Sequence, residues 1–328
     1  MKPGAARRCV HWISGLALAA GACGAAAQAP KFPSKPVRVL VGFAPGGATD
    51  IVARSFAPGL GEALGQSVIV ENRPGASSQI AGELVAKAPP DGHMLLMTTQ
   101  TLMTSQMIEK KTYPDFVKDF APVSLCATGT LMLVVNPSLP VKSVKELIAL
   151  ARARPGELNY ASGGVGTTPH LSGELLATMA RIRMVHVAYK GEAPALIDVI
   201  GGHVPVMFSN VSASQGFVQA GKLRALAVTS LKPSPALPGM PTVAESGLPG
   251  FEVVGFFGVL APAATPRETV ARLNGEIGKV LARPDIRERF ASQALEPANM
   301  TAEQFANYIK VEVGRWGKLI REAGIAMK

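Results

Sequence analysis

Short apolar strands alternate with amphipathic helices over most of this 328-residue chain, and this alternation limits the folds open to it. A strand at Val37–Phe43 precedes a helix expected over Ile51–Leu64. The same order returns at Leu158–Ala161 and His170–Met179. Strands that alternate with helices favour βαβ units and a largely parallel sheet. The pattern predicts the α/β class, with a sheet flanked by helices in each of two domains.

The strand and helix pattern changes at two places along the chain. One set of units ends around Pro122, and a second set begins near residue 130. A proline-rich connector, residues 232–249, then leads to a strand at Phe251–Leu260. Three helices follow that strand without a sheet of their own, so we expect them to pack on the first domain.

This arrangement requires the chain to pass between the domains twice, near 122–132 and near 240–258. Two crossings make a hinge, and we expect a ligand cleft between the domains. The predicted division is a leader at 1–27, a discontinuous first domain at 28–128 plus 250–328, and a second domain at 129–249.

The N-terminus has the pattern of a secretory signal. A basic segment, Lys2–Arg8, precedes the apolar stretch Val10–Ala22, which is too short to remain as a membrane anchor. A small-x-small site at Ala25 and Ala27 would release a chain that begins at Gln28. We therefore expect export to the periplasm, with the net charge falling from +10 to +7 as three positive charges leave.

The cysteines fit the same interpretation. Ala20–Cys23 resembles a lipoprotein cleavage box, but Ala20 stands where a larger aliphatic residue is usual, so we expect no lipid anchor. Cys9 leaves with the leader as well, which leaves Cys126 without a disulfide partner. Export counts against ATP, NAD or DNA as partners. The dispersed basic residues also indicate no nucleic-acid surface.

Two glycine-rich loops have the same design. Pro45-Gly46-Gly47 and Ser162-Gly163-Gly164 each follow a strand and precede a helix. The N-terminus of a helix offers unpaired N–H groups and a partial positive charge, and glycine lets a ligand approach the backbone. Such turns suit a carboxylate or phosphate. The alternative is that each loop only makes a tight turn, and the presence of two loops in two domains favours a binding role.

Nucleotide, metal and catalytic motifs are not found. Gly164-Val165-Gly166 lacks the third glycine of a dinucleotide fingerprint, and neither loop has the Gly-Lys-Ser/Thr of a P-loop. The histidines have no metal-ligand spacing. We predict no cofactor, no metal site, no catalytic residue and no enzyme activity. An exported hydrolase using Ser162 stays open, because triads assemble from distant positions.

Several other side chains are candidates for the cleft, each with a structural alternative. Phe43 can wall the pocket or pack in the core, and Asp50 can contact the ligand or cap a helix. Thr99 and Gln100 follow a strand and can line the cleft or a solvated loop. Thr167, Thr168 and His170 can bind an oxyanion or cap the next helix, and His170 can also stack in place. Lys190 can instead be a surface charge, and Asp198 can belong to the polar face of a helix.

The chain resembles the periplasmic substrate-binding component of tripartite tricarboxylate transporters, the Bug family. The resemblance runs in order along nearly the whole mature chain, and only the set of motifs is specific. The stretches that carry it are Phe32–Arg38, Pro45–Asp50, Val70–Ala76, Pro90–His93, Ala161–Gly164, His170-Leu171, Tyr189–Gly191, Gly221–Ala227, Met240–Gly247 and the tail around Trp316.

This resemblance implies a type II-like periplasmic binding fold that closes on its ligand. It implies a small organic anion as ligand, such as a di- or tricarboxylate or an aromatic acid, and a membrane permease with a large and a small subunit as partner. We expect a monomer. The predicted ligand-binding residues are Phe43, Pro45, Gly46, Gly47, Asp50, Thr99, Gln100, Ser162, Gly163, Gly164, Gly166, Thr167, His170, Tyr189, Asp198 and Ser209, with Phe208 and Asn210 beside Ser209.

The chain also departs from the family pattern. Pro205 and Ser209 stand where the family often has acidic residues, and His93 where Tyr is usual. We expect Pro205 and Ser209 to lie near the cleft, where the loss of acidic groups would disfavour a ligand with a distal amine and favour one with a second carboxylate or an apolar end. A ligand sensor that feeds a membrane signalling protein remains a further alternative on the same fold.

Overall fold

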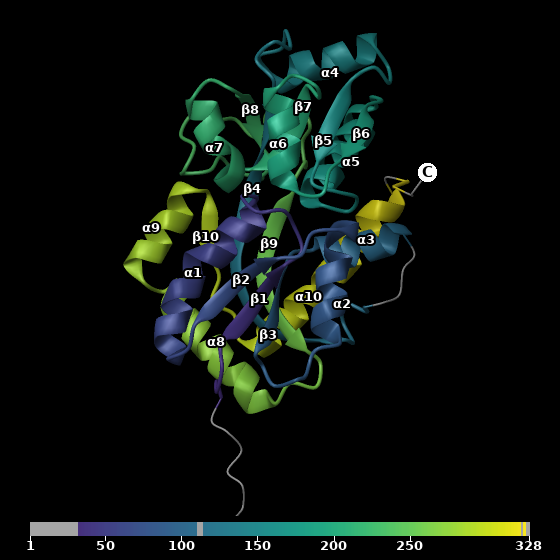
Figure 1. The fold of residues 1–328 in the computed structure, drawn as a ribbon. Helices are drawn as coiled ribbons and strands as arrows, with labels where there is room; N and C mark the ends of the chain where they lie inside the picture. The colour runs from purple at the N-terminus through teal and green to yellow at the C-terminus, as the bar shows by residue number, and fades with distance from the viewer. Residues whose placement is uncertain (1–31, 110–113, 323, 326–328) are drawn as a thin grey trace, which may run out of the picture. The chain divides into compact units, whose positions relative to one another are not determined.

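The computed structural model describes residues 32–109, 114–322 and 324–325, in a mixed α/β architecture (Figure 1). The predicted leader, with Cys9 and Cys23, lies outside these residues. In the described residues no helix combines the length and the apolar character needed to cross a membrane. The strands are β1 (Val37–Val41), β2 (Val68–Asn72), β3 (Met94–Thr98), β4 (Phe120–Val135), β5 (Asn159–Ser162), β6 (Val185–Ala188), β7 (Val206–Asn210), β8 (Arg224–Val228), β9 (Val254–Pro262) and β10 (Leu295–Pro297).

Helices flank these strands, as the alternation predicts. The helices are α1 (Ala48–Leu64), η1 (Ala76–Ser78), α2 (Gln79–Ala86), α3 (Thr101–Glu109), α4 (Val144–Ala153), α5 (Thr168–Ala180), α6 (Glu192–Ile200), α7 (Val211–Gln219), α8 (Arg267–Leu281), α9 (Pro284–Ser292) and α10 (Ala302–Glu322).

The strands follow the order β2-β1-β3-β9-β4-β7-β5-β6, and β8 and β10 also pair with β4. The first sheet contains β1, β2, β3, β9, β10 and the N-terminal part of β4. β1 pairs parallel with β2 and β3, while β9 runs antiparallel to β3 and β4. The second sheet contains the C-terminal part of β4 with β5, β6, β7 and β8. Figure 1 shows the two sheets with their helices at opposite ends of β4.

β4 joins the two sheets because its partners change along its length. It pairs with β9 as far as Thr130, opposite Val254. From Leu131, opposite Asn210, it pairs with β7 and β8. The return connection lies beside it, since the Val253 N–H donates to the Thr229 carbonyl. The two passages of the chain between the sheets therefore run next to each other, as in the two-domain periplasmic binding fold.

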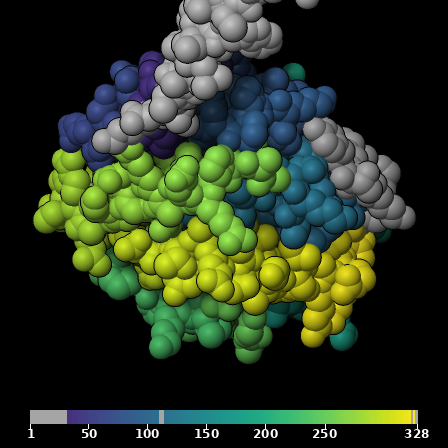
Figure 2. Space-filling view, turned by 90° about the horizontal axis from the view of Figure 1, so that it is seen from below, coloured from purple at the N-terminus to yellow at the C-terminus, as the bar shows by residue number. Residues whose placement is uncertain are grey.

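Alternation along β1 explains how helices cover both faces of the first sheet. Val37, Val39 and Val41 share one core cluster with α1 and α8, while Leu40 shares another with α2, α3 and α10. The C-terminal helices thus pack on the first sheet, and Trp316 of α10 is 1% exposed. Figure 2 shows α8 and α10 as adjacent bands across one face.

Local expectations differ from the structure at several places. Helix α1 begins at Ala48 with Gly47 as its N-cap, so neither Thr49 nor Asp50 is the cap residue. Two helices were not predicted, α3 and α7, because polar Thr and Ser residues in them resemble loop composition. The second set of units was expected to begin near residue 130, but β4 already begins at Phe120, and its earlier part contains Pro122 and is irregularly paired.

Candidate functional site

A cavity of about 40 Å³ lies between elements of both sheets, at the carboxyl ends of β1, β3, β5 and β7. Ligands of α/β proteins bind at such strand ends. Within the described residues, no Lys, Arg or His lines this cavity, and one carboxylate does. The lining residues are Phe43, Gly47, Ala48, Thr49, Thr99, Thr101, Gly163, Thr167, Thr168, Pro169, Glu192, Asn210, Gly255, Phe256 and Phe257.

The first glycine loop, Pro45–Gly47, is held by charged groups at the start of α1. Asp50 Oδ2 accepts the Gly46 N–H at 3.0 Å, and Asp50 Oδ1 accepts hydrogen bonds from Arg54 at 3.0 Å and from the Asn72 side-chain amide at 2.9 Å. Burial opposes ionisation of Asp50, but these donors outweigh it and lower its pKa. Gly46 has φ +82°, a conformation that favours glycine. Asp50 therefore stabilises the conformation of the loop by accepting the Gly46 N–H, and it does not line the cavity.

The N-terminus of α1 points at another carboxylate of the protein. The Ala48 N–H donates to Glu192 Oε2 at 3.2 Å, and Gly47 provides no side-chain cap. Glu192 begins α6, 144 residues later in the chain, and is 8% exposed. This contact joins the first glycine loop to an element of the second sheet.

Glu192 accepts four hydrogen bonds in total. Oε1 receives the Ser209 hydroxyl at 2.8 Å and the Asn210 N–H at 2.6 Å. Oε2 receives the Ala48 N–H and, at 2.9 Å, the Asn210 side-chain amide. Burial raises the pKa of Glu192, and the four donors act against this rise. A carboxyl group surrounded only by donors matches the acceptor-only character of the ionised form.

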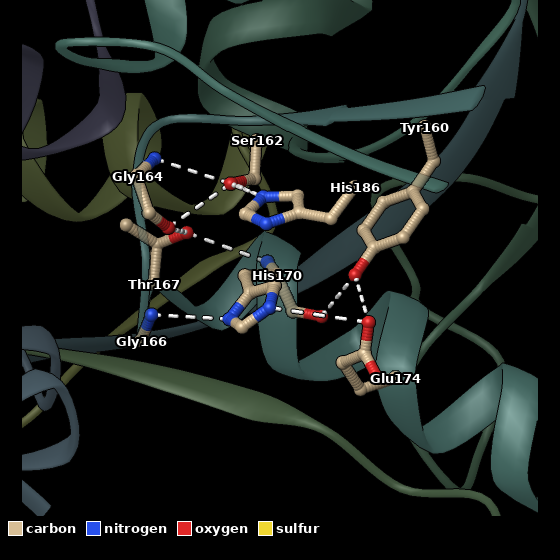
Figure 3. Close-up of polar contacts among 8 residues, drawn as sticks. All are labelled: Tyr160, Ser162, Gly164, Gly166, Thr167, His170, Glu174 and His186. Carbon is tan, nitrogen blue, oxygen red and sulfur yellow. Dashed lines mark hydrogen bonds and ion pairs between the residues drawn. The ribbon is translucent and has the colours of Figure 1, made fainter. Parts of the chain in front are cut away.

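The second glycine loop, Ser162–Gly164, is held by uncharged groups (Figure 3). Ser162 Oγ accepts the Gly164 N–H at 3.1 Å and lies 2.6 Å from His186 Nε2. The Gly166 N–H donates to His170 Nδ1 at 3.1 Å, and the Thr167 hydroxyl donates to the Gly164 carbonyl at 2.7 Å. Several N–H groups before α5 are thus satisfied locally.

Three stacked rings lie beside this loop (Figure 3). The rings of His170 and His186 lie 4.0 Å apart, and Tyr160 stacks on His186 at 5.0 Å. The Tyr160 hydroxyl donates to Glu174 at 2.6 Å. Burial lowers the pKa of His170 to about 3, with repulsion from His186 adding to it, and burial lowers the pKa of His186 to about 4. Both rings are neutral at physiological pH.

Some donors that border the cavity have no acceptor among the described residues. The Gly163 N–H makes no hydrogen bond there, and the hydroxyls of Thr101 and Thr168 each accept a hydrogen bond without donating one. Thr168 accepts from Gln100, whose side-chain oxygen accepts the Phe256 N–H at 3.2 Å. These groups can donate to an anion in the cavity.

Aromatic residues form the apolar part of the lining. Phe43, Phe256 and Phe257 are 8%, 1% and 2% exposed, and the last two follow Gly255 on β9. Phe256 packs edge-on against Phe305 and Tyr308 of α10. The cavity therefore combines neutral hydrogen-bond donors with an apolar wall, and it contains one negative charge.

The predicted site residues fall into three groups in the structure. Five line the cavity: Phe43, Gly47, Thr99, Gly163 and Thr167. Eight support the lining or its loops through contacts or chain position: Gly46, Asp50, Gln100, Ser162, Gly164, Gly166, His170 and Ser209. Three do not line it: Pro45, which is exposed, and Tyr189 and Asp198, which bind each other at 2.5 Å.

Sequence reasoning missed Glu192 and the lining residues Ala48, Thr49, Thr101 and Phe256. A sequence signal for Glu192 was available, because it follows Tyr189-Lys190-Gly191 at a helix start, where acidic residues are favoured. The expectation about Pro205 was wrong, because Pro205 precedes β7 at the end remote from the cavity. Ser209 does lie at the site, but Glu192 supplies an acidic group there.

The geometry gives little support to hydrolytic chemistry. Ser162 is close to His186, but it is fully buried and is not among the lining residues. In the described residues, no group of three His, Cys, Asp or Glu side chains is arranged to hold a metal ion. Cys126 is buried on β4, and burial raises the pKa of its thiol.

Comparison with known protein sequences gives consistent matches. A family model described as "Tripartite tricarboxylate transporter family receptor" matches residues 52–325. A UPF0065 protein from the tcbD-tcbE intergenic region of Pseudomonas sp. strain P51 is 41% identical over 312 residues, which cover 94% of this chain and 93% of the relative. Protein BugT of Bordetella pertussis is 36% identical over 320 residues, covering 96% and 98%.

Solved structures give similar matches. An R. palustris protein with adipate has a TM-score of 0.88 at 38% identity, covering 90% of this chain and 99% of that chain. The periplasmic binding protein BugD has a TM-score of 0.87 at 33% identity, covering 90% and 100%. MatC from Rhodopseudomonas palustris with bound malate has a TM-score of 0.82 at 30% identity, covering 88% and 100%.

Proposed function

Because this chain belongs to the tripartite tricarboxylate transporter receptor family, we propose that it captures a small organic carboxylate between its two domains and delivers it to a membrane permease. The family is one of periplasmic solute-binding proteins that includes the Bug proteins. The ligand class that we propose is a di- or tricarboxylate or an aromatic acid.

The observation that carries this proposal is the set of unused donors around the cavity. The Gly163 N–H and the hydroxyls of Thr101 and Thr168 can converge on a carboxylate without a cation. The apolar wall of Phe256 and Phe257 suits the carbon skeleton of an organic acid. The adipate and malate carried by two structural neighbours are acids of this kind.

We propose domains at 28–128 plus 250–328 and at 129–249, and the change of partners along β4 supports these boundaries. Pairing changes between Thr130 and Leu131, and β9 begins at Val254. The cavity is lined by elements of both sheets, so relative movement of the domains would open it.

The proposed location is the periplasm, reached through cleavage of the leader at 1–27. Solved relatives described as periplasmic support this location. The proposed partners are the ligand and a permease with a large and a small subunit, and we propose that the protein acts as a monomer. We propose that the protein releases the ligand without converting it chemically, because the family and its structural neighbours are binding proteins.

The test is a thermal-shift screen of the mature protein with a carboxylate library, followed by titration calorimetry and analysis of the ligand after incubation. A bound acid raises the unfolding temperature with its concentration and is recovered intact. Thr168→Val should weaken binding about 10- to 100-fold, the range for a hydrogen bond to a charged group. Thr178→Val is the matched control, since Thr178 is exposed on the same helix.

Failure of every acid in the library to stabilise the protein would contradict the proposal. Consumption of the acid would favour the hydrolase alternative. Equal affinity of Thr168→Val and Thr178→Val would remove Thr168 from the site while leaving carboxylate capture in place.

A further inference from the structure

The cavity contains a carboxylate of the protein itself, at a place where a ligand carboxylate would otherwise bind. Glu192 is the one charged residue among those that line it in the described part of the chain. Its oxygens receive donors from three elements: Ala48 at the N-terminus of α1, Ser209 at the end of β7, and Asn210 at the start of α7. All four favourable positions around this carboxylate are therefore filled.

The two sides of the cavity consequently differ in what they can offer a ligand. On the side of the first glycine loop, the Ala48 N–H and the Asn210 amide are already bound to Glu192. On the side of the second loop, the Gly163 N–H and the Thr168 hydroxyl have no acceptor among the described residues. Glu192 therefore fills one carboxylate position from within the protein and takes two of the donors on the side of the first loop.

We propose that Glu192 is a specificity-determining residue that restricts this cavity to acids with a single carboxylate and excludes dicarboxylates. This inference rests on the proposed capture of a carboxylate and narrows the ligand class given there: acids with one carboxylate, such as an aromatic acid, remain, and di- and tricarboxylates are excluded. A second ligand carboxylate would meet the negative charge of Glu192 in a small cavity where water screens little. It would also find the Ala48 N–H and the Asn210 amide already bound to Glu192. The far end of the ligand instead faces the apolar wall of Phe43, Phe256 and Phe257.

The charge of Glu192 is held in place by its surroundings. Gly191, which precedes it, has φ +141° and lies against Ala44, so the start of α6 is fixed beside the first loop. The side chain also bridges elements of both sheets. Displacement of Glu192 by a ligand would break four hydrogen bonds at once, which opposes exchange of the internal carboxylate for an external one.

The experiment compares matched acids on the full mature chain by titration calorimetry. Hexanoate and adipate have six carbons each and differ in the second carboxylate, as butanoate and succinate do at four carbons. We expect the wild type to bind the monocarboxylate of at least one pair at least tenfold more tightly than its dicarboxylate. Glu192→Gln keeps the size of the side chain and removes its charge, and it should reduce this ratio at least tenfold.

Two further variants make the result interpretable. Glu192→Ala removes charge and bulk at a helix position that alanine suits, so it tests the inference if Glu192→Gln fails to fold by circular dichroism. Glu312→Gln is the matched control, because Glu312 is a buried carboxylate on α10 that accepts from Trp316 outside the cavity. The control should keep the wild-type ratio.

The possible outcomes separate this inference from the proposed function. Equal or tighter binding of dicarboxylates by the wild type, or an unchanged ratio in Glu192→Gln and Glu192→Ala, would overturn the role of Glu192 while carboxylate capture stands. Binding of no acid by the wild type or either variant would overturn carboxylate capture and this inference with it.

Discussion

The two glycine loops have the same sequence design, but they are supported in opposite ways. Around the first loop, Asp50 and Arg54 form a charged pair, and the Arg54 side chain is 50% exposed. Around the second loop, Ser162, His170 and His186 form a buried and uncharged network. Helix α1, which follows the first loop, lacks a side-chain cap, whereas Thr167 caps helix α5, which follows the second loop.

This difference teaches that a glycine turn before a helix does not by itself make an open anion site. The second loop uses the N–H groups of Gly164, Gly166 and Thr167 for its own structure. The first loop presents the Ala48 N–H, but Glu192 takes it. What remains for a ligand is Gly163 together with threonine hydroxyls from neighbouring elements.

The largest expected effect is on binding, from a methyl group added to each loop in turn. A Cβ on Gly163 would lie 3.0 Å from the backbone of Gly191 and Glu192, while a Cβ on Gly47 would be 3.4 Å from its nearest neighbour, the Glu192 side chain. Gly163→Ala should therefore weaken carboxylate binding about 100-fold and Gly47→Ala less than tenfold, as measured by calorimetry. Equal losses would mean that the loops are equivalent after all.

An effect of similar size, on stability and not on binding, is expected from acid, and it concerns the second loop. The folded-state pKa values of His186 and His170 are lowered to about 4 and about 3, so below about pH 6.5 the unfolded chain binds protons that the folded protein does not. The free energy of unfolding should fall as the pH drops from about 6.5 to about 4, on the order of 3 kcal/mol for His186 alone.

Urea denaturation at several pH values measures this slope, and His186→Gln should flatten it. Glu192 acts with the opposite sign, because its raised pKa makes stability fall as the pH rises. The acid effect should therefore be clearest in a Glu192→Gln background. A slope that His186→Gln leaves unchanged would argue against buried neutral histidines beneath the loop.

The smallest expected effect concerns the charged support of the first loop. Asp50→Asn should lower the free energy of unfolding by about 1 kcal/mol, because Arg54 is half exposed and water weakens the pair. Salt should reduce the difference between variant and wild type. Ser162→Ala provides the contrast, since its effect should be independent of salt. A salt-dependent Ser162→Ala or a salt-independent Asp50→Asn would reverse the comparison.

The sequence allowed the α/β class, the alternation of strands and helices and the two loops to be predicted, because these follow from local periodicity and turn residues. The antiparallel pairing of β4 and β9 departs from the largely parallel sheet that was expected. Glu192 could not be placed in the same way, because its partner Ala48 is 144 residues distant. Phe256 and Phe257 have the composition of an ordinary buried strand. Only the pairing of β9 with β3 and β4 brings them to the cavity.

The neutral hydrogen-bond donors in the cavity have a consequence for the release of the ligand. In the part of the chain that the structure describes, no Lys or Arg lines the cavity and could bind the anion by itself. The donors that can bind the ligand are the Gly163 N–H and the hydroxyls of Thr168 and Thr101, which belong to segments attached to different sheets. In the proposed transport role, separation of the domains would move these donors apart and break their hydrogen bonds to the ligand together. A binding protein of this kind can release its ligand to the permease without breaking a strong ion pair.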